Sequence, residues 1–197
     1  MSLIQRLSAS LFSRKRVVLL LVSTLAVFGT ILELSGGIWD AASHALREPE
    51  FFWSIQHVVV YSGVIMIGTS SIFGSILLLK KKVSGNLKKG IKIIIIGSVI
   101  QISSGYADSI SHDVFGNDGL LSWSHQPLEI GLILSSLGAF IILCDPRLEK
   151  FSKILPISIM TLILSIMWVG FNLSLLIGGT ILCIPIYEIF SSGCAIL

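Results

Sequence analysis

The stretch that decides the fold is Val17–Trp39, with the sequence VVLLLVSTLAVFGTILELSGGIW. Glu33 is its one ionisable side chain, and a helix of roughly 20 apolar residues crosses the hydrocarbon core of a bilayer. The basic cluster Arg14–Arg16 precedes it, which is also how a signal peptide begins. However, the apolar run is longer than the core of a signal peptide, and no A-x-A-like cleavage site follows it. The sequence therefore predicts a membrane-spanning helix here.

The composition extends this prediction to the whole chain. Of the 197 residues, 53% are hydrophobic and 13% are charged, whereas soluble domains carry about 25% charged residues. Further spans are predicted at Val58–Leu79, Ile91–Ala107 and Pro127–Cys144. The run Ile154–Phe190 is too long for one span, so we expect a C-terminal helical hairpin over about 153–190, with a tight turn within residues 168–172. The predicted fold class is an all-α, polytopic transmembrane helix bundle of about six spans, forming a single integral membrane domain over residues 1–197.

The distribution of basic residues predicts the orientation in the membrane. Of fourteen Lys and Arg residues, four precede the first span, six lie in Lys80–Lys92 and three lie in Arg147–Lys153. Only Arg47 falls in the opposite set of loops. Because cytoplasmic loops are enriched in Lys and Arg, we expect a multi-pass protein of the cell membrane with a cytoplasmic N-terminus. No stretch is typical of a nucleic-acid-binding surface, and the lipid bilayer is the expected partner.

Two loops that are predicted to face the extracytoplasmic side of the membrane, together with their flanking helix ends, contain every histidine of the chain. They share the pattern Asp-x3-His-x12-His, first in residues 40–57 and again in residues 108–125. When the chain is shifted by 68 residues, glycines on the flanking helices also coincide, Gly29 with Gly97 and Gly63 with Gly131. An even number of crossings separates the copies, so they share one orientation. We therefore predict a parallel internal repeat of two helical hairpins, over about 17–79 and 91–144.

The spacing within each copy brings three metal-binding groups together. Asp40 and His44 are four residues apart, so they lie on one helix face, and His57 begins the next helix of the hairpin. An ionisable group near a membrane needs a partner or a function, and one carboxylate with two imidazoles suits copper, zinc or non-haem iron. The three cysteines lie away from these groups and are interpreted as packing residues. The predicted metal ligands are Asp40, His44 and His57 in one site, and Asp108, His112 and His125 in the other.

Three further polar residues are placed to support the ligands. Glu33 lies seven residues before Asp40, while Tyr61 and Glu129 follow the second histidine of each copy by four residues. Metal-bound imidazoles usually donate their second N–H to such a group. We expect Glu129 to accept this hydrogen bond and Glu33 to be an extra ligand or a proton carrier, although a simple helix-end carboxylate is an equally good interpretation of Glu33.

The pattern Asp-x3-His with a second His at the head of the next helix, followed by Tyr61-Ser62, resembles the C subunit of the copper membrane monooxygenases, which oxidise methane or ammonia. The resemblance covers roughly residues 30–131. It implies copper at Asp40, His44 and His57 and a second cluster at Asp108, His112 and His125, where the family has Asn in the place of Asp108. The proline that the family usually has two residues before the second His is replaced by Ile55 and Trp123.

Three functions are compatible with these features. The first is a copper-dependent monooxygenase, or a subunit of one, which would oxidise a small substrate with O₂ and would need companion membrane subunits. The second is a non-catalytic membrane protein that binds copper or zinc; the absence of Met clusters and nearby thiols argues mildly against Cu(I) trafficking. The third is a zinc-dependent membrane hydrolase, since an open zinc site lowers the pKa of its bound water to about 7.

Overall fold

The structure is a computed structural model that describes residues 15–46, 53–115 and 125–178. In these ranges five helices are long and apolar enough to cross a membrane, whereas about six spans were predicted for the whole chain. Many large apolar side chains face outward along them, which suits a lipid environment. The chain is therefore a multi-pass membrane protein. In order, the elements are α2 (Lys15–Ala45), α3 (Ile55–Leu79), α4 (Gly85–Phe115), α5 (His125–Leu143), the short 3₁₀ segment η1 (Pro146–Ile154) and α6 (Leu155–Leu176).

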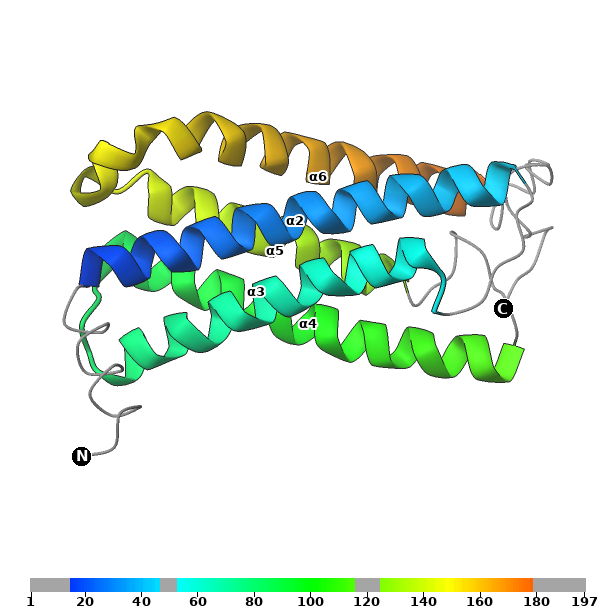
Figure 1. Ribbon diagram of the computed structural model, residues 1–197, viewed down its shortest axis with the longest axis horizontal. Helices are drawn as coiled ribbons and strands as arrows, with labels where there is room; N and C mark the ends of the chain where they lie inside the picture. The colour runs from blue at the N-terminus through cyan, green and yellow to red at the C-terminus, as the bar shows by residue number, and fades with distance from the viewer. Residues whose placement is uncertain (1–14, 47–52, 116–124, 179–197) are drawn as a thin grey trace.

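The helices run along one common direction with alternating polarity (Figure 1). α2 packs against α3, α4 packs against α5, and α6 packs against α5 and α2. The last turns of α2 and α4 and the first turns of α3 and α5 therefore meet at one end of the bundle. The buried apolar core lies toward the opposite half, around Val22, Ile67 and Ile94. The two Asp-x3-His-x12-His segments meet at the other end, where the interior of the bundle contains buried polar side chains.

Glycines allow the two helices of each hairpin to pack closely. A Cβ atom at Gly63 on α3 would lie 2.7 Å from the Cγ atom of Glu33 on α2. A Cβ atom at Gly131 on α5 would lie 2.6 Å from the Cγ atom of Gln101 on α4. Both separations are shorter than a normal contact between carbon atoms, which is about 3.5–4.0 Å. Glycine at these two positions thus sets how closely each helix pair can approach.

The predicted spans agree with the helices, but one predicted turn is wrong. The tight turn expected at residues 168–172 is absent, because α6 runs without a break from Leu155 to Leu176. Polar side chains in that stretch bond back to the helix itself: Asn172 donates to the carbonyl oxygen of Trp168 at 3.1 Å, and Ser174 to that of Gly170 at 2.7 Å. Glycine is tolerated in a lipid-embedded helix. The first residues of the expected second arm continue α6, and the rest of that arm, residues 179–190, lies outside the described part of the chain.

At the opposite end of the bundle, Asp145 stabilises the link between α5 and η1. Its carboxylate accepts two hydrogen bonds from the Arg147 guanidinium, at 2.7 and 2.8 Å, and one from the Arg147 backbone N–H at 3.0 Å. These hydrogen bonds to Arg147 hold the pKa of the Asp145 carboxyl below its usual value. The charged form of Asp145 is therefore the form that the folded state favours.

Replacement Asp145→Asn is expected to lower the thermal midpoint of the purified protein at neutral pH. The lowered pKa of Asp145 contributes stability that is fully present above the carboxyl pKa of the unfolded chain, about 4, and that is lost as the pH falls through the folded-state value. The difference between the wild-type protein and the variant should thus shrink in acid. Thermal unfolding in detergent from pH 7 down to pH 3 measures it, and an unchanged difference across this range would contradict the role of the charge.

Candidate functional site

The first carboxylate–imidazole pair joins α2 to α3. Asp40 lies near the end of α2 and His57 lies in the first turn of α3. The Nε2 atom of His57 is 3.4 Å from the Oδ1 atom of Asp40, and both residues are buried. Beside this pair, the Gln56 amide donates to the Ser43 hydroxyl, a second link between the same helix ends. The hairpin therefore brings these two groups together as the spacing predicts.

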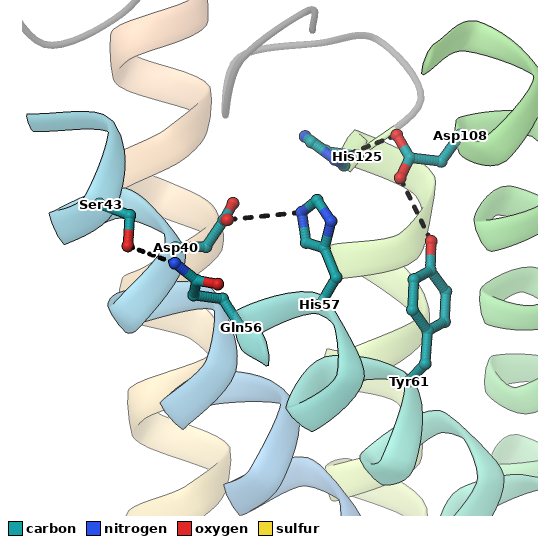
Figure 2. Close-up of polar contacts among 7 residues, drawn as sticks. All are labelled: Asp40, Ser43, Gln56, His57, Tyr61, Asp108 and His125. Atoms are coloured by element: carbon teal, nitrogen blue, oxygen red, sulfur yellow. Dashed lines mark hydrogen bonds and ion pairs between the residues drawn. The ribbon is translucent and has the colours of Figure 1, made fainter. Parts of the chain in front are cut away.

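The second pair joins α4 to α5 in the same way. The Nε2 atom of His125 is 3.0 Å from the Oδ1 atom of Asp108. The other carboxylate oxygen of Asp108 accepts a hydrogen bond at 3.2 Å from the hydroxyl of Tyr61, which belongs to α3. Figure 2 shows both pairs, with Tyr61 reaching from the first hairpin to the aspartate of the second. The spacing along α3 predicts that Tyr61 supports His57, but its hydroxyl also ties the two hairpins together.

Both aspartate–histidine pairs line the same cavity. This cavity has a volume of about 60 Å³ and lies between the hairpins and α6. It is large enough for an ion with bound water or for a small molecule. Its lining combines acidic, imidazole, aromatic and apolar side chains: Glu33, Gly37, Asp40, His57, Val60, Tyr61, Asp108, His125, Leu128, Glu129, Leu132 and Trp168.

Two aromatic rings wall this cavity, and each packs on a glycine. A Cβ atom at Gly37 would lie 3.2 Å from the Trp168 ring, and one at Gly105 would lie 2.8 Å from the Tyr61 ring. Trp168 also lines an apolar groove between α2 and α6, and Tyr61 also lines a groove between α3 and α4. Each ring thus separates the polar cavity from the outer surface of the bundle.

Two glutamates line the cavity deeper in the bundle, and both are only 4% exposed. The Oε2 atom of Glu33 accepts a hydrogen bond at 2.9 Å from the amide of Gln101 on α4. The Trp168 side chain on α6 lies close to the Glu129 carboxylate and lines the same cavity. The indole N–H can only donate a hydrogen bond, which makes Trp168 a suitable neighbour for a carboxylate.

The structure describes some of the predicted ligands and supporting residues but not others. Asp40, His57, Asp108, His125, Glu33, Tyr61 and Glu129 all line the one cavity. His44 and His112 belong to the last turns of α2 and α4, but their side chains lie outside the described part of the structure. Within the described residues, no three His, Cys, Asp or Glu side chains are grouped closely enough to hold one metal ion. The described part of each site is thus an aspartate–histidine pair.

Sequence reasoning missed Trp168. The predicted turn places it in a loop, whereas α6 directs it toward Glu129 and the cavity. No spacing signal marks this residue, because its partners are on α2 and α5, far away in the sequence. Buried polar residues along α6, such as Thr161, Ser165 and Asn172, were the available hint that one face of this helix packs on protein rather than on lipid.

Chemically, each pair combines a carboxylate acceptor with an imidazole in a site largely closed to water. The carboxylate orients the ring, and both groups are metal ligands when deprotonated. The fold and the site together define a multi-pass membrane protein with a polar, carboxylate-rich cavity at one end of its helix bundle. Comparisons with known protein families, with curated proteins and with solved structures found no match.

Proposed function

We propose that this chain is a membrane metalloprotein that binds transition-metal ions at its two aspartate–histidine pairs. The single observation that carries the proposal is that both buried aspartate–histidine pairs line the same cavity. A structural role alone would not require two buried ion-pairing groups at equivalent places, since such groups are costly to bury. Metal binding would explain why both pairs are buried beside the same cavity.

The donor set determines which ions suit these sites. Asp40 with His57, and Asp108 with His125, offer oxygen and nitrogen donors that fit copper, zinc or non-haem iron. His44 and His112 are proposed as the third ligands, since each lies four residues after the aspartate of its site. Three protein ligands leave positions open for water or a substrate, which is typical of catalytic rather than structural sites.

We further propose that the two hairpins are a parallel internal repeat. Positions 68 residues apart make matching contacts: Gly63 meets Glu33 as Gly131 meets Gln101, and Gly37 and Gly105 each receive an aromatic ring. The hydrogen bond between Gln101 and Glu33 joins two such matching positions directly. Contact between equivalent residues is expected close to a pseudo-twofold axis.

The resemblance to the copper membrane monooxygenases favours copper, with oxidation of a small substrate by O₂ as the activity. When bound, copper would supply the redox chemistry. The protein would hold the metal, orient the substrate in the cavity and exclude bulk water. The orientation proposed from the basic residues places the cavity toward the extracytoplasmic side. Companion membrane subunits would have to deliver electrons, because the sequence contains no recognisable electron-transfer motif.

Metal analysis of the protein purified in detergent tests the proposal. We expect copper, zinc or iron to co-purify or to bind on reconstitution, up to two ions per chain at the Asp–His pairs. Copper bound through nitrogen ligands, seen by electron paramagnetic resonance, would support the monooxygenase-like function, whereas zinc would favour a hydrolytic one. Failure of all three metals to bind at micromolar concentration would reject the metalloprotein function.

A further inference from the structure

We infer that Glu33 and Glu129 form a subsite for a hard divalent cation, with Mn²⁺ as its best probe, at the inner end of the cavity. This subsite is separate from the aspartate–histidine pairs and does not depend on their binding a metal. It rests on the depth of the two glutamates, on their unpartnered oxygen atoms and on the charge of the cavity lining.

Both glutamates lie deeper in the bundle than the pairs. Glu33 precedes Asp40 by seven residues along α2, which is about 10 Å along the helix axis. Glu129 follows His125 by four residues along α5, about 6 Å. Since the pairs lie at the hairpin-loop end, both carboxylates lie on the side of the cavity away from the loops.

Each glutamate has one buried carboxylate oxygen that lacks a hydrogen-bond donor. These atoms are Oε1 of Glu33 and Oε2 of Glu129. The other oxygen of Glu33 accepts a hydrogen bond from Gln101, and the Trp168 side chain lies close to the Glu129 carboxylate. Gln101 therefore holds the Glu33 carboxylate in place, and each glutamate keeps one acceptor atom for a ligand in the cavity. A buried acceptor without a donor is costly, so a ligand that satisfies both atoms would be stabilised.

The cavity lining contains more acidic than basic groups. Four carboxylates line the cavity but only two imidazoles do, and none of the described residues that line it is Lys or Arg. If all four carboxylates were ionised and both imidazoles protonated, two negative charges would remain. A buried charge must be neutralised by a proton, a partner or a metal ion. One divalent cation between Glu33 and Glu129 balances the lining without protonating either of them.

The donor atoms select the type of cation. The subsite offers carboxylate oxygens and neither imidazole nor thiolate, and such ligands suit Mg²⁺, Ca²⁺ and Mn²⁺. Mg²⁺ in particular is usually held by one or two carboxylates and keeps several of its waters. The cavity volume of about 60 Å³ leaves room for such waters. Mn²⁺ has the same preference for oxygen and can be followed by electron paramagnetic resonance.

Titration of the detergent-solubilised full chain with Mn²⁺ tests the subsite. We expect the wild-type protein to bind one Mn²⁺ at the inner carboxylates, and Glu33→Gln or Glu129→Gln to weaken this binding at least about 10-fold, since each removes one charge without changing the side-chain size. Glu149→Gln is the matched control, because Glu149 is exposed on η1 far from the cavity, and it should bind as the wild type does. The double variant His57→Ala/His125→Ala should still bind Mn²⁺ if the inner carboxylates hold it.

A second measurement needs no variant and so does not depend on the folding of one. Hydrophobic carbodiimides modify protonated carboxyl groups in membrane proteins, and peptide mass spectrometry locates the modification. We expect Mn²⁺ to protect Glu33 and Glu129 from this reagent in the wild-type protein. The subsite is overturned if Mn²⁺ gives no protection, if the two Gln variants bind Mn²⁺ as tightly as the wild type, or if only the double His variant loses Mn²⁺. In the last case the ion would belong to the Asp–His pairs.

Discussion

His57→Ala is expected to remove one bound metal ion from the protein and to leave a second ion at Asp108 and His125. His57 supplies the α3 side of the first pair, and its Nε2 atom lies 3.4 Å from the Asp40 carboxylate. Loss of a residue that only supports a metal ligand weakens metal binding about 10–100-fold, so loss of a ligand itself should weaken the first site by at least about 100-fold. Inductively coupled plasma mass spectrometry after dialysis measures the number of ions retained per chain.

The Tyr61→Phe variant tests whether the hydrogen bond from Tyr61 of the first hairpin to Asp108 of the second contributes to metal binding. Tyr61 lies one helical turn after His57, yet its hydroxyl donates to Asp108 of the other pair. Phenylalanine keeps the ring that packs on Gly105 and removes only the hydroxyl. We expect weaker metal binding at the second pair and unchanged binding at the first. If Tyr61→Phe weakened the first site alone, the arrangement of Tyr61 across the two hairpins would have no part in metal binding.

Gly63→Leu is expected to destabilise the bundle by about 3 kcal/mol, the upper range for forcing a side chain into a well-packed interior. A Cβ atom at this position would already lie 2.7 Å from the Cγ atom and 2.9 Å from the backbone nitrogen of Glu33. A backbone atom of α2 cannot move aside, so α2 and α3 would have to separate. The cavity should open as well, because Glu33, Asp40 and His57 lie on these two helices.

Gly170→Leu is the matched control for this substitution. Gly170 lies within α6, but a Cβ atom added there would meet no other atom within 4 Å. A leucine there would extend into the lipid or detergent and should change the stability by no more than about 0.5 kcal/mol. Thermal unfolding of both variants in the same detergent measures the contrast. Equal midpoints for Gly63→Leu and Gly170→Leu would show that the close packing of α2 on α3 contributes little.

Much of the architecture followed from local features of the chain. Apolar length alone located the helices α2 to α5, because the bilayer sets the length of a spanning helix. The pairing of Asp40 with His57 and of Asp108 with His125 was also predictable. A short loop between antiparallel helices brings the end of one beside the start of the next, so each pair lies within one hairpin.

The sequence by itself thus determined the spanning helices and the composition of each aspartate–histidine pair, since both depend on neighbours along the chain. Only the tertiary structure decided that the two pairs share one cavity, that Tyr61 reaches Asp108, and that α6 continues past Gly170 and brings Trp168 to Glu129. These features depend on how separate helices pack side by side. Within a bilayer that packing is governed by close fit and by hydrogen bonds between helices, which no spacing along a single helix encodes.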